Sequence, residues 1–305
     1  MINSYTTAAD FQQTRDFGQK ISAVFDFLRL HFRPLFRCLV QYALLVPLAG
    51  FIAAGVAQKL FFPGYQPTGL STVFMVGMAP AVLLSYIPLL LGYALLILTV
   101  YGYVNERMAT PAAQEVPSAQ VGAFVRAHFL RTFGSLIGLG VVLMLAFMLL
   151  FVPGVWLGVP ASLFFIVQLR ENRSFGDTLT RCVALVKGHW WATLGLLIVI
   201  SFIQAVLPLL VQVVGGILLG VGATLTGGSE GLDLPLLTYG WVAVSNLLSL
   251  VMYTLVLLAI AFQYFNLVEL KEGRGVYALL DELGRPAPVG QPTGQRYRAD
   301  EEGEY

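Results

Sequence analysis

The amino-acid sequence predicts an all-α integral membrane protein with six transmembrane helices that form three hairpins. Three observations carry this prediction: an apolar composition, six long hydrophobic stretches, and basic residues that gather on one side of those stretches. Hydrophobic residues make up 57% of the 305 residues and charged residues only 11%, which is too little charge to cover a soluble domain of this size. The composition therefore excludes a soluble globular protein.

The hydrophobic stretches are close to or longer than the roughly 20 residues that a helix needs to cross a bilayer. Helices are expected because an open sheet would leave backbone groups unpaired in hydrocarbon. We expect the six spans over residues 34–57, 73–104, 129–152, 153–169, 190–221 and 235–268. Because only the turn Val152-Pro153-Gly154 separates the third span from the fourth, these two should form a tight antiparallel hairpin.

The distribution of lysine and arginine predicts the orientation of the chain. Of the 18 basic residues, 17 fall in the segments 15–37, 107–131, 170–187 and 271–298, which six spans place on one side; Lys59 is the exception. Since basic residues accumulate on the cytoplasmic side, we expect both termini in the cytoplasm. Residues 1–13 lack the pattern of a cleaved signal peptide, so the first span should remain as an anchor.

All three histidines stand in one local frame, which reads apolar, apolar, basic, small or apolar, histidine, aromatic. The frames are Phe27-Leu-Arg29-Leu-His31-Phe, Phe124-Val-Arg126-Ala-His128-Phe and Leu185-Val-Lys187-Gly-His189-Trp. Each frame leads into a hydrophobic stretch. We therefore expect an internal repeat in which a surface helix bends into the membrane at an elbow, the bend beside each histidine.

The residues before the frames favour amphipathic helices in the cytoplasmic headgroup layer. Apolar residues recur at helical spacing before His31 and His189, and Asp16 and Ser174 are expected to cap the two helices. The copy before His128 is weaker, because Gln114 occupies an apolar position. The predicted pattern is pseudo-threefold: interfacial helix, span, span.

The chain is expected to form a single membrane domain over residues 1–285. Its repeats cover about 16–105, 114–170 and 174–270, and a short amphipathic helix follows at 274–284. Glu106, Glu171 and Glu272 end the three repeats, each near a basic residue. Residues 286–305 are rich in Pro, Gly and Gln and predict a disordered cytoplasmic tail.

One region has a family resemblance. Residues 150–195 contain the Pro-Gly hairpin, Glu171, an arginine followed by a small residue, and a Leu-Val-Lys-Gly step before aromatics. In these motifs the chain resembles the membrane domain of bacterial glycerophosphoryl diester phosphodiesterases and the related stand-alone multi-pass membrane proteins. Cys182 stands where that family usually has serine. The resemblance implies a multi-pass fold and a place in the bacterial inner membrane.

Catalysis is not expected. The phosphodiesterase chemistry of the similar family resides in a separate soluble barrel, which needs roughly 200 residues or more that this chain cannot supply outside its membrane segments. The sequence also lacks a Gly-rich phosphate loop, a Ser-His-Asp arrangement and a Cys-x-x-Cys pair. Cys38 and Cys182 are expected to be ordinary apolar residues.

Two interpretations of the histidine frames compete. Three imidazoles could meet on a pseudo-threefold axis and bind zinc or phosphate, but the histidines are separated by unequal intervals of 97 and 61 residues. Aromatic and basic residues at a membrane interface explain the frames without a metal. The favoured candidates for contacts with lipid headgroups are Arg29, Arg33, Arg126, Arg131, Arg181, Lys187, His31, His128 and His189.

The function predicted from these features is a non-enzymatic membrane protein that organises or senses the bilayer, or supports a membrane partner. No cofactor, metal or nucleic acid is expected; membrane lipids, with anionic lipids as candidates, are the expected partners, and a protein partner or homo-oligomer stays open. The alternative is a transporter or lipid-translocating protein. The spans carry no ionisable residue near their centres, so a cavity lined by Gln204, Gln212 or Asn246 would be needed to favour it.

Overall fold

The structure is a computed structural model that describes residues 5, 8–61, 80–111, 114–225 and 234–273. All secondary structure in these ranges is helical. The elements in chain order are α1 (Ala8–Phe11), α2 (Phe17–Cys38), the π-helix η1 (Leu39–Leu44), α3 (Leu45–Phe61), α5 (Pro80–Ala109), α6 (Ser118–Leu149), α7 (Phe151–Ala161), α8 (Phe164–Glu171), α9 (Phe175–Val186), α10 (Trp190–Leu225) and α11 (Leu234–Glu272).

Six helical stretches in the described part of the chain are long and apolar enough to cross a membrane. They are Phe17–Ala53, Tyr86–Ala109, Ser118–Leu149, Phe151–Glu171, Trp190–Leu218 and Ala243–Glu272. The predictions of an all-helical chain and of six such helices are therefore confirmed, and the protein has the character of a multi-pass membrane protein.

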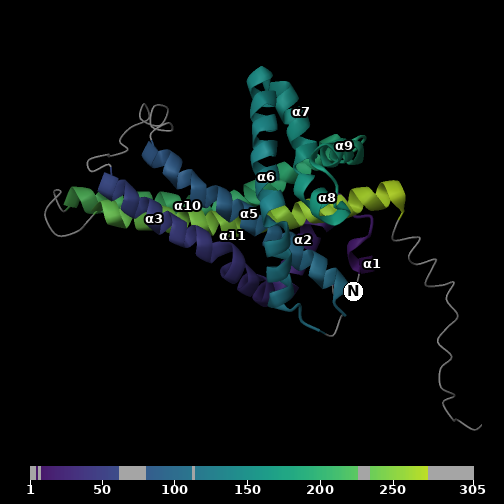
Figure 1. Cartoon of the computed structure of the whole chain (residues 1–305), viewed down its shortest axis with the longest axis horizontal. Helices are drawn as coiled ribbons and strands as arrows, with labels where there is room; N and C mark the ends of the chain where they lie inside the picture. The colour runs from purple at the N-terminus through teal and green to yellow at the C-terminus, as the bar shows by residue number, and fades with distance from the viewer. Residues whose placement is uncertain (1–4, 6–7, 62–79, 112–113, 226–233, 274–305) are drawn as a thin grey trace, which may run out of the picture.

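The long helices run in two directions (Figure 1). Helices α3, α5, α10 and α11 lie along the length of the molecule, whereas α6 and α7 lie side by side and run across it. Helix α11 is central, because it packs against α2, α3, α5, α9 and α10. Its buried side chains, such as Leu258 and Phe262, meet those of α5, such as Leu96 and Tyr101, in one continuous core.

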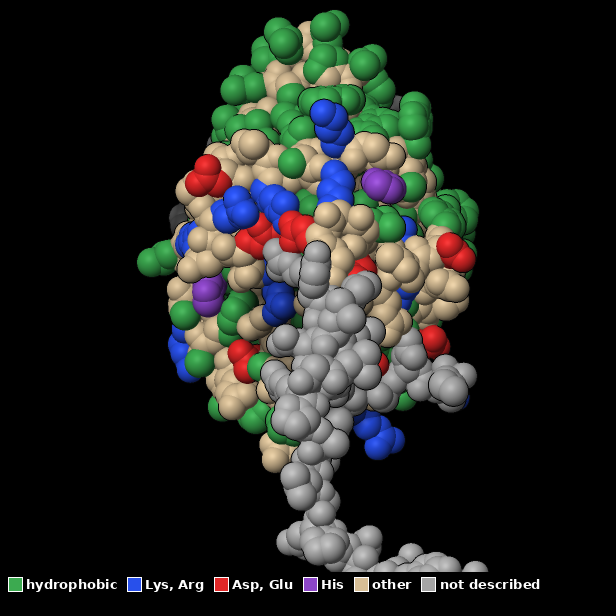
Figure 2. Space-filling model, turned by 90° about the vertical axis from the view of Figure 1, so that its right-hand side faces the viewer, with side chains coloured by type: hydrophobic (Ala, Val, Ile, Leu, Met, Phe, Trp, Pro, Cys, Tyr) green, Lys and Arg blue, Asp and Glu red, His purple; other side chains and the backbone are tan. Residues whose placement is uncertain are grey.

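Helices α8 and α9 meet the last turn of α11 at one end of the bundle. We call this the basic end, because Arg170, Arg173, Arg181, Lys187 and Lys271 lie there. Figure 2 looks onto this end and shows basic and acidic side chains together, with hydrophobic side chains gathered above them.

The two predicted helix caps are confirmed. Helix α2 begins after Asp16, whose backbone N–H donates to Oε1 of Gln19 at 3.0 Å. Helix α9 begins after Ser174, whose hydroxyl accepts a hydrogen bond from the backbone N–H of Asp177 at 3.3 Å. Both contacts satisfy donors that a helix start leaves without an intrahelical partner.

Of the three expected elbows, the first and third coincide with local breaks in the helix. The backbone of His31 is non-helical (φ −110°, ψ 15°), three residues before Pro34, which lacks an N–H and crowds the carbonyl of Leu30. Between α9 and α10, Gly188 has φ +88°, a conformation that residues with a Cβ rarely adopt. The chain therefore changes direction at these two frames.

The middle elbow is absent, which corrects the sequence prediction. Helix α6 continues without a break from Ser118 to Leu149, so His128 lies inside one long helix. The physical reason is the local sequence: Ala127 stands where the third frame has Gly188, and Arg131 stands where the first frame has Pro34, so no helix-breaking residue adjoins His128. The threefold repeat and its surface helices remain predictions.

The Pro-Gly turn is also placed wrongly by the sequence analysis. The chain reverses at Leu150, which is extended (φ −161°, ψ 143°), and Pro153 and Gly154 lie in the first turn of α7. Proline is tolerated there because the first turn of a helix leaves its N–H groups unpaired. Gly154 allows close packing, since a Cβ at this position would lie 2.4 Å from a ring carbon of Phe147.

Two predicted segments lie outside the described residues: the short helix expected at 274–284 and the tail expected at 286–305.

Candidate functional site

The candidate site is a basic hollow of about 510 Å³ beside the kink in α2. It lies between the kink, the last turns of α5, and residues 114–116 that lead into α6. Its charged lining residues are Arg29, Arg33, Arg107 and Glu115. Three cations against one carboxylate make this hollow a site that attracts anions.

Two of the predicted headgroup residues reach the hollow from one helix. Arg29 and Arg33 lie on α2, one before and one after the kink at His31, and both line the hollow. Both side chains are exposed, so both can meet a ligand. The hollow also includes Phe32, which is 51% exposed and offers an apolar contact next to the charges.

Arg107 forms the inner wall of the hollow and was not among the predicted site residues. It is 3% exposed, and its guanidinium donates to the carbonyl oxygens of Thr110 (2.8 Å), Pro111 (2.8 Å) and Gln114 (2.7 Å). These carbonyls follow the C-terminal end of α5, where a cation is favoured. The signal that could have identified Arg107 is a basic residue in the last turn of a helix that ends just before a proline.

The guanidinium of Arg107 is not fully satisfied. Its Nε is buried and has no partner within the described part of the chain, although buried polar groups nearly always have one. No carboxylate forms an ion pair with Arg107 among the ion pairs of the described residues. The positive charge at the inner wall is therefore held by carbonyl dipoles alone, which leaves it able to attract an anion in the hollow.

His31 supports the wall of the same hollow. Its ring stacks on Phe27 with 4.6 Å between centroids, and Nδ1 lies 3.3 Å from the carbonyl oxygen of Phe27. The edge of the ring faces Tyr103, at 6.2 Å between centroids. His128 repeats the geometry on α6, since it stacks on Phe124 at 4.3 Å and its Nδ1 lies 2.9 Å from that residue's carbonyl oxygen. In both frames, the aromatic residue four positions earlier explains the histidine's position.

The three histidines do not converge. His31 lines the basic hollow, His128 lies on α6, and His189 lines a different hollow of about 290 Å³ together with Arg15 and Lys20. Unlike the other two, His189 lies next to a helix start, where its carbonyl accepts from Oγ1 of Thr193 at 2.9 Å. Within the described ranges, no three His, Cys, Asp or Glu side chains are placed to hold a metal ion.

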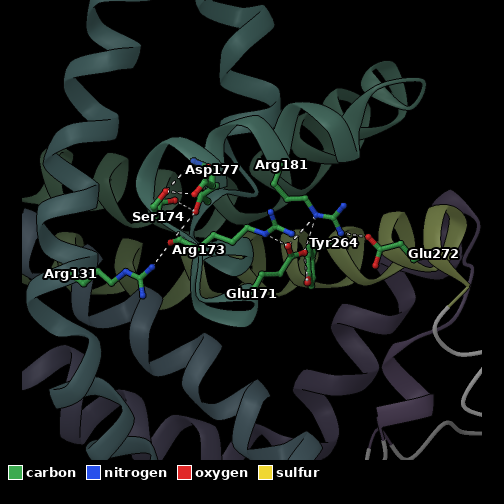
Figure 3. A network of polar contacts seen from close by, with 9 residues as sticks. Arg131, Glu171, Arg173, Ser174, Asp177, Arg181, Tyr264 and Glu272 are labelled. Atoms are coloured by element: carbon green, nitrogen blue, oxygen red, sulfur yellow. Dashed lines mark hydrogen bonds and ion pairs between the residues drawn. The ribbon is translucent and has the colours of Figure 1, made fainter.

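Two of the predicted acidic positions belong to an ion-pair network at the basic end (Figure 3). Nε of Arg181 donates to both carboxylate oxygens of Glu171 at 3.1 Å, and its Nη2 pairs with Glu272. Glu171 also accepts from Nε of Arg173 at 2.7 Å and from the hydroxyl of Tyr264 at 3.2 Å. Burial alone would lower the pKa of Arg181, but its hydrogen bonds to Glu272 and Glu171 raise it. Arg181 thus joins α8, α9 and α11.

The remaining predicted residues are distributed over the basic end. Arg131 donates to the side chain of Asn172 and to the backbone carbonyl of Arg173, so it attaches α6 to the turn between α8 and α9. Arg126 and Lys187 are exposed and lie outside the basic hollow. Glu106 is half-buried in the last turn of α5, next to Arg107. Only Arg29, Arg33 and His31 of the predicted set share one site.

A separate cavity of about 470 Å³ lies among α5, α6, α7, α10 and α11. Its lining is mostly aliphatic, with the hydroxyl-bearing residues Tyr93, Tyr101, Ser162, Ser201 and Tyr253. No charged residue is among those that line it, and neither are Gln204, Gln212 or Asn246. The cavity is therefore suited to an apolar guest rather than to an ion.

Comparisons with known proteins do not assign the chain to a family. No model of a protein family matches the chain, and no curated protein or solved structure matches it.

Proposed function

We propose that this chain is a non-enzymatic, multi-pass membrane protein that binds anionic lipid headgroups at its basic end and so organises or senses the bilayer, or supports a partner there. The basic hollow carries the proposal, because Arg29, Arg33 and the buried Arg107 surround it with only Glu115 opposing them. Arginine suits this role, since its planar guanidinium can donate two hydrogen bonds to one phosphate.

The size of the effect follows from the charges. A basic residue close to an anionic membrane surface contributes about 1 kcal/mol of attraction. The two exposed arginines of the hollow would then contribute about 2 kcal/mol, which corresponds to roughly a 30-fold preference for an anionic lipid over a neutral one. Phe32 and the aliphatic parts of the arginines would lie against the first carbons of the acyl chains.

The test is lipid retention measured by native mass spectrometry of the protein in mild detergent, titrated with phosphatidylglycerol and, separately, with phosphatidylcholine. The double variant Arg29→Gln with Arg33→Gln should bind phosphatidylglycerol about 30-fold more weakly. Arg37→Gln is the matched control, because Arg37 is exposed on the same helix but does not line the hollow.

Unchanged retention in the double variant would contradict the proposal, and so would an equal loss in Arg37→Gln. A parallel variant, Arg126→Gln with Lys187→Gln, removes basic residues of two other histidine frames that lie outside the hollow. It should keep most of the retained lipid. Inorganic phosphate added as a competitor distinguishes a headgroup site from a site for a free anion. A lipid also contacts Phe32 on the membrane side, so phosphate should not displace a bound lipid, whereas it should compete fully at a site for a free anion.

The same proposal places the basic end in the cytoplasm, because lysine and arginine accumulate there. We also propose that the chain is related to the membrane domain of bacterial glycerophosphoryl diester phosphodiesterases and lies in the bacterial inner membrane. The motifs between residues 150 and 195 support this part of the proposal. Protease accessibility of a C-terminal tag in spheroplasts tests the orientation directly.

A transporter or lipid-translocating protein is the second candidate. The observation in its favour is the cavity that Tyr93, Tyr101 and Tyr253 line, which could hold an acyl chain. Against it, the amide nitrogens of two buried glutamines make contacts between helices: Gln263 donates to Thr193 and Gln168 donates to Ser135, both at 2.8 Å. Such pairs stabilise helix packing in lipid. Transbilayer movement of a fluorescent lipid in proteoliposomes would favour this candidate.

A further inference from the structure

The tip of the α6–α7 hairpin is a strongly exposed apolar surface. Met148 is 82% exposed, Leu149 77% and Val152 74%. These residues surround Leu150, where the chain reverses. Figure 1 shows the tip projecting away from the bundle, and Figure 2 shows hydrophobic side chains extending beyond the charged surface of the basic end.

The tip lies at the same level of the bundle as the first turn of α10. Phe151 and Val152, at the tip, line one apolar hollow of about 450 Å³ with Trp190 and Trp191. The indole N–H of Trp190 donates to the backbone carbonyl of Trp156 on α7 at 3.2 Å. The tip is therefore next to the beginning of α10.

The beginning of α10 belongs to the basic end. Three residues before Trp190, the carbonyl of Lys187 accepts a hydrogen bond at 3.2 Å from Nζ of Lys271, near the end of α11. Arg181 and Glu272 pair in the same place. A hairpin that crossed the bilayer from this end would have its tip roughly 30 Å away, on the far side of the hydrocarbon core.

We infer that the α6–α7 hairpin does not cross the membrane and instead lies in the leaflet at the basic end, with its tip in the boundary between headgroups and acyl chains. The membrane crossings are then four: the continuous stretch Phe17–Phe61, α5, α10 and α11. The lipid boundary is the partner of the exposed tip. The inference does not depend on the proposed headgroup site, because it rests on the hairpin's direction and on the tip's neighbours.

Three features identify lipid as the occupant. Trp156, Trp190 and Trp191 gather beside the tip, and tryptophan prefers the membrane–water interface. The charge along α6 is arranged accordingly, since Arg126 and Arg131 lie in its first half and the segment 132–149 carries no charge. The absent middle elbow also follows, because a helix that stays in the plane of the membrane has no need to bend into it.

A hairpin in one leaflet has a mechanical consequence. Each helix is about 10 Å across with its side chains, so two helices side by side displace lipid from one leaflet and leave the other unchanged. Such a wedge favours membranes whose basic-end leaflet is on the outside of a curve. This assigns the hairpin a role in sensing or producing curvature.

The experiment measures spin-label distances in the full-length protein reconstituted in lipid bilayers. One label replaces Val152 and the second replaces Ala192, both exposed positions; Cys38 and Cys182 are buried and should not react. The expected distance is well below the roughly 30 Å of the hydrocarbon core. The control pair, Ala192→Cys with Val221→Cys, lies entirely within α10, 29 residues apart, and should be separated by about 44 Å.

A distance of about 30 Å or more between labels 152 and 192 in the bilayer overturns the inference, because the hairpin would then cross. A single label in Met148→Cys tests the occupant. Relaxation by oxygen that exceeds relaxation by a water-soluble nickel chelate is the expected result for lipid contact. The reverse order would place the tip in water, and dipolar coupling between singly labelled molecules would show that a second copy covers it; either result overturns the lipid assignment.

Discussion

Replacement of Arg181 by methionine tests whether the ion-pair network holds the basic end together. The change keeps much of the side-chain length and removes the charge that Glu171 and Glu272 share. The side chain of Arg181 is 18% exposed and that of Glu171 only 8%, so water can replace the lost contacts only in part. The carboxylate of Glu171 keeps Arg173 and Tyr264 as partners.

The expected cost lies between two limits. Exposed ion pairs contribute about 0–1 kcal/mol, whereas removal of one partner from a fully buried pair costs about 3–5 kcal/mol. Because the network is partly buried and Glu171 retains two partners, Arg181→Met should lower the free energy of unfolding by about 2 kcal/mol. For a chain of this size, that corresponds to a fall in melting temperature of about 3 °C.

The assay is thermal unfolding of the purified protein in detergent, followed by circular dichroism. Arg173→Met is the matched control, because Arg173 contacts the same carboxylate but is 45% exposed, and it should cost under about 1 kcal/mol. The combination of Arg181→Met with Glu171→Gln should cost less than the sum of the single changes. An unchanged melting temperature in Arg181→Met, or a larger loss in Arg173→Met, would refute the reasoning.

Two further predictions concern α9 and its ends. Gly188→Ala should destabilise by about 1–2 kcal/mol because φ is +88° there, whereas Gly176→Ala, which has open space inside α9, should stabilise by up to about 1 kcal/mol; equal melting temperatures would contradict this. Burial raises the pKa of the Cys182 thiol to about 12 from an ordinary value of 9.0. The folded state therefore keeps the thiol proton that the unfolded state loses, so this contribution to stability is present below pH 9 and is lost as the pH rises towards 12. Cys182→Ala should remove that part of the alkaline loss, and thiol labelling of the folded wild type at pH 8 should be negligible.

Much of the architecture could be predicted from local sequence. The hydrophobic stretches predict the six long helices, and Asp16 and Ser174 predict the starts of α2 and α9, because capping depends on neighbouring residues alone. The candidate site was predicted in part. Arg29 and Arg33 follow from their spacing on one helix, but Arg107 reaches the same hollow from a segment more than 70 residues further along the chain.

The predictions that were wrong involve competition between local signals and packing. Pro153 and Gly154 predict a turn, yet they lie inside α7, because the first turn of a helix tolerates proline and Phe147 packs closely on the glycine. The frame around His128 predicts an elbow by analogy with the other two, yet it has no helix-breaking residue. Similar frames therefore need not produce similar bends.

The sequence by itself determined that this is a membrane protein, that it is helical and that its charges gather towards one end. These properties depend on composition and on the length of apolar runs. Only the tertiary structure decided which charges meet. The three histidines lie apart, and Arg181 forms ion pairs with Glu171 and Glu272. Arg107 lines the same hollow as Arg29 and Arg33. Helices α6 and α7 run across the other long helices. These outcomes depend on contacts between segments far apart in the chain, which hydrophobic pattern and local propensity do not specify.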